Sequence, residues 1–434
     1  MHVVLVVPIS PSTVGVGLAG RVRNWQESLS RLGDVSTLVV PVAGPSGTTD
    51  TVITPGPDSD ESLPRLARGL TEDWGHRFRL HATDADVIVA VRSYLGLFAL
   101  GLARATNAPV IVDLDDDDAD FFRQRGDLAE SQRFESLVSR LRERGAHLVS
   151  ASGFDSTHRV PNTAPQPASM SRLATVPARI VIVGNFRYEP NAEGAQWFID
   201  SVLPLVHEHA PSVELRLVGP ASERFAPYGV GIVDDLAMEY SQAALAACPI
   251  LIGSGTRTKI IEAWMHGVPV VSTTIGADGL GASHDESILL ADEPFDFANQ
   301  IVRLTSDDEL ARRLSTSART VAENLFSPDV VASAVSDIAL PLVTDRSRMY
   351  VMASNLHLTE TDDGLVVLDH SNDSVHNLNS TASMVLYLAD GTLDPQGIAE
   401  EIRLALDLTQ PPTEHVIEAI GQLCRIGLIS ARFV

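Results

Sequence analysis

The sequence has few cysteines, little positive charge and no long apolar run, and each shortage excludes a class of protein. Its only two cysteines, Cys248 and Cys424, lie far apart among apolar neighbours, which indicates reduced, buried thiols and excludes a disulfide framework or a cysteine metal site. With 32 Lys and Arg against 56 Asp and Glu, the net charge is -24. That charge excludes an extended basic surface for nucleic acid or an anionic membrane.

No apolar run approaches the roughly 20 residues that a membrane helix needs. The apolar start at residues 1–8 has no basic leader and no small-residue cleavage pattern, so it predicts a strand and not a signal peptide. We therefore expect a soluble, cytoplasmic protein.

What the sequence does contain is a repeated strand and helix pattern. Its 434 residues, 44% of them hydrophobic, can form two or three domains. In the first part, short apolar segments alternate with amphipathic stretches of helical period, which is typical of a doubly wound parallel sheet. The expected strands are residues 3–7, 36–40, 87–91 and 109–113. Ligands of such sheets bind beyond the carboxyl ends of the strands, where four residues fall: Gly15, Gly17, Arg92 and Asp113.

A second unit of the same kind follows a Pro-, Ala- and Ser-rich connection at residues 163–177. The loops at Gly184 and Gly253 follow expected strands, so both can face the first unit across one cleft. Arg187, in the first of these loops, is either a solvated loop arginine or a phosphate ligand. We predict Rossmann-like domains at residues 1–165 and 166–345. The second begins with a strand at 179–183, and its further expected strands or strand ends are 214–219, 231–235, 249–252 and 270–272.

The segment 253–262 predicts a cradle for a diphosphate. Two glycines let backbone N–H groups approach a ligand, and a helix starting near Thr256 directs its positive end at the same place. Arg257 and Lys259 add full charges. Glu262 follows Lys259 on the same helical face, where its carboxylate could bind a ribose diol. The alternative is an ordinary helix in which Lys259 and Glu262 form a surface pair.

The acidic run at residues 113–120 has three interpretations. Clustered carboxylates suit a divalent metal. Acidic residues also favour the first turn of a helix, and one is expected to begin around Phe121. A third interpretation is that Asp115 or Asp116 faces an acceptor in the cleft.

Several motifs together resemble a family 4 glycosyltransferase, most clearly from residue 180 to 295. They are Val183-Gly184-Asn185, Pro190-Asn191, Trp197-Phe198, Val233-Asp234-Asp235, Gly255-Thr256-Arg257, Lys259, Glu262-Ala263, Gly267 to Val271, and Gly276 to Leu280. The resemblance implies the GT-B fold, in which two Rossmann-like domains face each other. It also implies sugar transfer from a nucleotide-diphosphate donor with retention, without a metal or another cofactor.

Residue roles follow from the same resemblance. Glu262 would bind the donor ribose, while Arg257, Lys259 and the Thr256 region would hold the diphosphate. The resemblance makes Arg257, Lys259 and Glu262 the expected catalytic residues. Gly15 or Gly17 would approach the phosphates or the acceptor from the other domain. The remaining expected donor-side residues are Gly184, Asn185, Arg187, Asp234 and Gly255, and the expected acceptor-side residues are Arg92, Asp115 and Asp116.

Two positions depart from the family pattern. Ser254 occupies the place of the first glutamate of an E-x7-E motif, which one branch of the family also lacks. No lysine follows Arg187, where many members have one. We assign no general base, and electrostatic stabilisation of the diphosphate by Arg257 and Lys259 could be the main catalytic device.

The last segment, residues 349–434, predicts a small α+β domain of three strands and three helices, similar to a winged helix. Asp362-Asp363-Gly364 joins two strands as a hairpin, and a third strand covers residues 374–378. DNA binding is not supported, because the last helix carries Arg425 against Glu414 and Glu418.

This domain resembles the PqqD-like peptide-recognition family through Leu368-Asp369, His376 to Asn379, Thr381-Ala382, Leu388 to Gly391, and Ile426 to Ile429. In that family the third strand and third helix bind the leader of a ribosomally made precursor peptide. The alternative is that these residues only pack the small core. The matching positions are Ser374, Val375, His376, Asn377, Leu378, Val416, Ile420 and Leu423.

Three functions remain open from the sequence. The first is a glycosyltransferase that modifies a ribosomally synthesised peptide recruited through its leader. The second is a glycosyltransferase for a saccharide or lipid-linked acceptor, in which the last domain serves regulation or docking. The third is a non-catalytic sensor of nucleotide sugars, suggested by Ser254.

Overall fold

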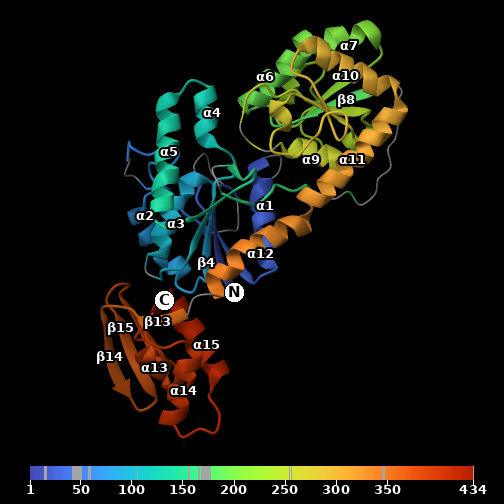
Figure 1. Cartoon of the computed structure of the whole chain (residues 1–434). Helices are drawn as coiled ribbons and strands as arrows, with labels where there is room; N and C mark the ends of the chain where they lie inside the picture. Colours follow the sequence, from blue (N-terminus) through green and yellow to red (C-terminus); the bar gives the residue numbers. More distant parts are fainter. Residues whose placement is uncertain are drawn as a thin grey trace.

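The computed structural model describes residues 1–13, 17–41, 51–56, 60–104, 106–154, 157–164, 167, 177–253, 255, 257–344 and 348–433. These residues form two parallel sheets flanked by helices and a small third unit, so the predicted α/β class with two Rossmann-like domains is confirmed. In Figure 1 the second domain lies at the upper right of the first, and the third unit, the C-terminal module, lies below the first domain.

The first domain is built on a seven-stranded parallel sheet of order β3-β2-β1-β4-β5-β6-β7. Alternate residues of β1 enter two different cores: Val4 and Val6 face one side, and Leu5 and Val7 face the other. Burial on both faces explains the continuous apolar strand sequences. The strands are β1 His2–Val7, β2 Asp34–Val39, β3 Thr51–Val52, β4 Val87–Val91, β5 Val110–Asp113, β6 His147–Ser150 and β7 His158–Arg159.

Helices cover both faces of this sheet. Phe98 of α3 and Phe134 of α5 pack on one face, and Trp25 of α1 packs on the other. The helices are α1 Gly17–Ser30, α2 Glu72–Arg77, α3 Gly96–Ala103, α4 Asp118–Gln124 and α5 Leu128–Glu143. Trp25 lies on the buried side of α1.

The second domain has a five-stranded parallel sheet of order β12-β11-β10-β8-β9. Two of the segments expected as strands or strand ends contain no strand residue. Residues 231–235 form a loop, and the strand expected at 249–252 lies at Leu245–Cys248, because Pro249 has no N–H with which to continue the ladder. The strands are β8 Arg179–Val183, β9 Glu214–Val218, β10 Leu245–Cys248, β11 Val270–Ser272 and β12 Leu289–Leu290.

The helices of the second half are α6 Glu189–Trp197, α7 Leu203–His209, α8 Leu236–Gln242, α9 Thr258–Met265, α10 Pro294–Ser306, α11 Asp308–Phe326 and α12 Pro328–Thr344. Among the described residues, one span, 308–343, is long and apolar enough to cross a membrane by length and composition alone. It consists of α11 and α12, and both pack apolar residues against the protein. Leu314 of α11 enters the second domain's core, whereas Val335 and Ala339 of α12 return to the first sheet.

The C-terminal module contains the predicted hairpin, third strand and three helices. Its sheet has the order β14-β15-β16, α13 packs against it, and α14 and α15 complete the shared core. A second pair, β13 with β17, joins the two ends of the module and was not predicted. The elements are β13 Arg348–Met352, β14 Leu356–Thr361, β15 Gly364–Asp369, β16 Ser374–Asn379, α13 Ser380–Leu388, α14 Pro395–Ala405, α15 Thr413–Arg425 and β17 Ile429–Phe433.

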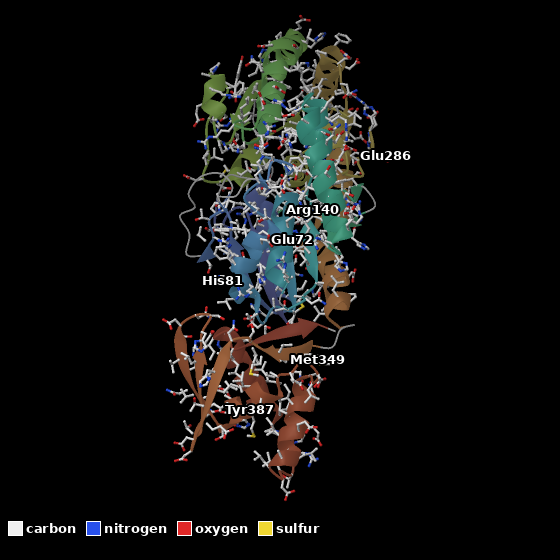
Figure 2. All side chains as sticks on the ribbon, turned by 90° about the vertical axis from the view of Figure 1, so that its left-hand side faces the viewer. Glu72, His81, Arg140, Glu286, Met349 and Tyr387 are labelled. Atoms are coloured by element: carbon white, nitrogen blue, oxygen red, sulfur yellow. The ribbon has the colours of Figure 1, made fainter. Side chains whose placement is uncertain are left out.

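Thr83 joins this module to the first domain. Its hydroxyl donates to the Cys424 carbonyl (3.0 Å), and the Ala431 N–H donates to the Thr83 carbonyl (2.9 Å). Thr83 precedes β4, so the module lies at the amino edge of the first sheet. Figure 2 shows Met349 and Tyr387 of the module below His81 and Glu72 of the first domain.

Candidate functional site

The predicted diphosphate cradle lies between β10 and α9, at the carboxyl edge of the second sheet. α9 begins at Thr258 with Arg257 in the capping position, two residues later than expected. Gly253 has φ of +130°, and a Cβ there would meet the Arg257 guanidinium at 2.6 Å, so this position needs glycine. Ser254 and Thr256 lie outside the described residues.

Arg257, at the start of α9, has a guanidinium group that is not fully hydrogen-bonded within the described part of the chain. Its Nε and Nη2 atoms are buried and have no hydrogen-bond partner among the described residues. Buried polar atoms are normally paired, and guanidinium groups bind phosphate oxygens by charge-assisted hydrogen bonds. Arg257 is therefore suited to hold an anionic group that enters beside Gly253.

Lys259 is the only lysine in the chain. Its Nζ donates to Asn191 Oδ1 at 2.6 Å. Gly184 lies next to it, since a Cβ added to Gly184 would be 3.4 Å from Nζ. Burial lowers the pKa of Lys259. The described residues contain no ion pair between Lys259 and Glu262, so the surface-pair interpretation is wrong. Asn191, a motif residue to which the sequence assigned no role, thus orients the lysine.

Glu262 lies one turn further along α9. The Tyr240 hydroxyl contacts its Oε2 at 3.5 Å and the Lys259 carbonyl at 3.3 Å. Burial raises the pKa of Glu262 to about 7, which Tyr240, Lys259 and Arg23 oppose. Arg23 comes from α1 of the first domain, so the carboxylate lies close to both domains. Neither Tyr240 nor Arg23 was predicted, because only the tertiary fold brings them to Glu262.

Other predicted donor-side residues differ in their placement. Gly184 and Asn185 form the loop after β8, where the Asn185 carbonyl accepts from Asn191 Nδ2 (2.9 Å) and its side chain accepts from the Arg187 N–H (3.0 Å). Arg187 and Asp234 are exposed, and Asp235, the residue after Asp234, caps α8. Gly255 is buried, Gly17 begins α1, and Gly15 lies outside the described residues.

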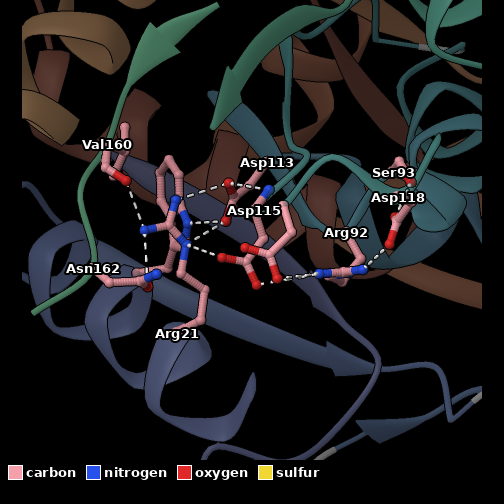
Figure 3. Close-up of polar contacts among 10 residues, drawn as sticks. Arg21, Arg92, Ser93, Asp113, Asp115, Asp118, Val160 and Asn162 are labelled. Atoms are coloured by element: carbon pink, nitrogen blue, oxygen red, sulfur yellow. Dashed lines mark hydrogen bonds and ion pairs between the residues drawn. The ribbon is translucent and has the colours of Figure 1, made fainter. Parts of the chain in front are cut away.

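The predicted acceptor side rests on a buried ion pair (Figure 3). Arg21 binds both oxygens of Asp113 at 2.8 Å, and Trp25 Nε1 donates to Asp113 Oδ2 at 2.7 Å. The Arg21 side chain is 2% exposed and that of Asp113 0%. Arg21 also donates to the Val160 carbonyl (2.7 Å) and the Asn162 amide (3.3 Å), so it ties β5 to the end of the first domain.

Arg92 organises the next carboxylates of the acidic run. It lies 3.3 Å from Asp115 and 3.8 Å from Asp116, and it pairs with Asp118. Burial, followed by the charge of Asp116, raises the pKa of Asp115 to about 7. Asp117 caps α4 by accepting from the Asp120 N–H, so the helix-start interpretation is confirmed. The described residues contain no group of three or more His, Cys, Asp or Glu placed to hold a metal ion.

The C-terminal module presents β16 as a sheet edge among the described residues. Ser374, His376 and Leu378 face inward, whereas Val375 is 63% exposed on the outer face with Asn377. The core-packing alternative therefore fails for Val375. The three predicted helix positions, Val416, Ile420 and Leu423, are at most 5% exposed and belong to the module's core.

Residues 177–307, from β8 to α10, match the family model described as glycosyl transferases group 1. An uncharacterized 44.6 kDa protein in the cps region of Klebsiella pneumoniae is 25% identical over 171 residues, which cover 36% of this chain and 44% of that protein. The chain therefore matches less than half the length of this curated relative.

Solved structures share the arrangement of the two domains. Sucrose-phosphate synthase from Thermosynechococcus elongatus is 17% identical, with a TM-score of 0.62 over 80% of this chain and 100% of that chain. HepE of Anabaena in complex with UDP and glucose is 16% identical, with a TM-score of 0.56 over 77% of this chain and 98% of that chain. The chain thus has a GT-B-like fold, and its second domain matches the group 1 glycosyltransferases.

Proposed function

We propose that this protein transfers a sugar from a nucleoside-diphosphate sugar, with retention of configuration, onto a ribosomally synthesised peptide. The observation that carries the donor assignment is the Arg257 guanidinium beside Lys259 at the start of α9, whose buried Nε and Nη2 atoms have no hydrogen-bond partner among the described residues. The group 1 family match over residues 177–307 supports it, as does the similar fold of HepE, which was crystallised with UDP.

In this mechanism the diphosphate binds at Arg257 and Lys259, and Glu262 accepts hydrogen bonds from the ribose hydroxyls. The bond between the anomeric carbon and the diphosphate oxygen breaks, and its electron pair stays on the diphosphate. Arg257 and Lys259 stabilise that developing charge. The acceptor oxygen then bonds to the same face of the sugar, and its proton passes to the departing diphosphate, so no protein base is required.

The peptide assignment rests on the C-terminal module. An extended leader can add to the exposed edge of β16, where backbone groups supply hydrogen bonds and Val375 supplies an apolar contact on the outer face. Binding there would raise the local concentration of a weakly bound acceptor, to about the millimolar range for a short flexible connection. The predicted contacts of Val416, Ile420 and Leu423 would then be indirect, because these side chains hold α15 in place.

The test is sugar transfer onto a small peptide encoded beside this gene, measured by mass spectrometry with a panel of nucleotide sugars. We expect the full-length peptide to be glycosylated faster than its isolated core segment. Val375→Asp should reduce transfer onto the full-length peptide at least tenfold. Thr359→Asp, on the exposed β14 edge of the same sheet, is the matched control and should leave the rate unchanged.

Equal rates with the full-length and core peptides would refute leader recruitment. Transfer to a saccharide or lipid-linked acceptor that is unaffected by Val375→Asp would favour the second function. Donor binding without turnover on any acceptor would favour the sensor.

A further inference from the structure

Helix α4 of the first domain and the residue after it contact two loops of the second domain, the one after β8 and the one after β10. Phe121 stacks on Tyr188 with ring centroids 6.0 Å apart. Arg125 pairs with Glu189 and lies 3.5 Å from Glu193. Gln124 Oε1 accepts a hydrogen bond from the Gly253 N–H at 2.8 Å. One of the backbone donors of the predicted diphosphate cradle is therefore already occupied by a side chain of the other domain.

Asp116, just before α4, occupies the other side of the same cradle. A Cβ on Gly255 would overlap the Asp116 carboxylate, so the carboxylate lies directly against the loop backbone. Arg257 and Arg92 both attract it electrostatically. The Asp116 side chain remains 37% exposed, so a soluble ligand can reach it.

These contacts reproduce the chemistry of a bound phosphate. A phosphate in the cradle would place negative charge beside Arg257 and an acceptor oxygen on the Gly253 N–H. In this structure the Asp116 carboxylate supplies the charge and the Gln124 amide oxygen supplies the acceptor. A diphosphate that enters the site meets the like charge of Asp116 at short range, which opposes binding.

We propose that Asp116 and Gln124 act as an internal substitute for the donor diphosphate and thereby set the affinity for nucleotide. Donor binding replaces both side chains. After the diphosphate leaves, Gln124 again accepts from the Gly253 N–H and the Asp116 charge again lies near Arg257. Asp116 is then a determinant of donor binding, which differs from the acceptor role predicted for it from the sequence. The inference rests on the proposed donor site.

The test is the affinity of the full chain for UDP, without acceptor, by titration calorimetry. Asp116→Asn removes the competing charge and keeps the shape, so UDP should bind about tenfold more tightly. Gln124→Ala frees one backbone donor and should tighten binding two- to threefold. Asp117→Asn, which retains a capping oxygen on the adjacent residue, should bind UDP as the unmodified protein does.

Lys259 provides an independent readout, because an amine-reactive reagent can label only this lysine and the terminal amine. Protection of Lys259 should reach half its maximum at about tenfold lower UDP concentration in Asp116→Asn. Unchanged or weaker UDP binding by Asp116→Asn would overturn the inference while leaving the donor site intact. Failure of every form of the protein to bind UDP, GDP, ADP or dTDP would instead overturn the proposed function as well.

Discussion

At the scale of single residues, the site separates charges that a surface helix would have paired. Lys259 donates to Asn191 and Glu262 contacts Tyr240. Two atoms of Arg257 have no hydrogen-bond partner in the part of the chain that the structure describes. Each charged group is partly withdrawn from water and lacks a full counter-ion from its own helix. Such an arrangement costs stability, and stability traded in this way is typical of sites that bind charged ligands.

Glu262 gives the first pH-dependent prediction. Its pKa of about 7 means that the carboxylate is protonated in mildly acidic solution and ionised above neutrality. An ionised carboxylate accepts hydrogen bonds from ribose hydroxyls more strongly than the acid does. We therefore expect UDP affinity to rise several-fold between pH 6 and 8. Calorimetric titration of Glu262→Gln should show weaker binding and much less of this rise.

The raised pKa of Glu262 also predicts how the stability of the nucleotide-free protein changes with pH. Because the folded pKa lies above the ordinary value of 4.5, the fold favours the protonated form, and stability is lost as the pH rises from about 4.5 to about 7. Glu262→Gln removes this loss and should stabilise the nucleotide-free protein by roughly 1–2 kcal/mol at pH 8, but little at pH 4.5. A variant less stable than the unmodified protein at pH 8 would contradict the burial of the charge.

At the scale of elements, local signals were readable from the sequence and distant contacts were not. Asp362-Asp363-Gly364 marks a hairpin, and these residues join β14 to β15 in the structure. Gly253 marks the loop before α9. In contrast, the bond from Lys259 to Asn191 joins residues 68 positions apart, and no periodicity specifies which loop meets which helix.

The packing of α12 also could not be predicted from the sequence. The sequence placed residues 328–344 with the second domain, yet α12 packs on α1 and the first sheet. An amphipathic pattern predicts that one face of a helix is buried, but it does not predict which domain that face packs against. Topology decides that, because the chain must return across the interface before it reaches the C-terminal module.

This packing predicts that α12 stabilises the first domain. Val335→Ala removes two methyl groups from a residue that is 1% exposed, which should cost about 2 kcal/mol and lower the thermal unfolding midpoint. Leu340→Ala is the control on the same helix. Leu340 is 41% exposed, so its loss should change stability by less than about 0.5 kcal/mol. Equal effects of the two substitutions would show that α12 does not pack as described.

At the scale of the whole molecule, the C-terminal module and the candidate donor site lie beyond opposite edges of the first sheet. The C-terminal module contacts Thr83 before β4, whereas Arg92 and Asp116 follow the carboxyl ends of β4 and β5. The Asp116 carboxylate lies against Gly255 of the second domain. A peptide held at β16 of the same chain must therefore pass along the first domain to reach the donor site. Separation of this kind suits a substrate in which the recognised and modified segments are distinct.

This geometry predicts a minimum spacing between leader and modified residue. β1 has six residues, so the sheet alone spans roughly 20 Å, and an extended peptide covers at most about 3.6 Å per residue. At least about six spacer residues are thus needed for the sheet, and on the order of ten once the loops at both edges are included.

Deleting spacer residues stepwise should leave leader affinity unchanged while transfer falls more than tenfold below about six residues. Adding ten Gly and Ser residues is the control, and it should lower the rate only slightly, because loop-closure entropy grows slowly with length. The rate per enzyme should not change on dilution, since one chain both binds and modifies the peptide. Full activity without a spacer, independent of enzyme concentration, would contradict a path along the first domain. Activity without a spacer that rises with enzyme concentration would show that one copy of the protein presents the peptide to another.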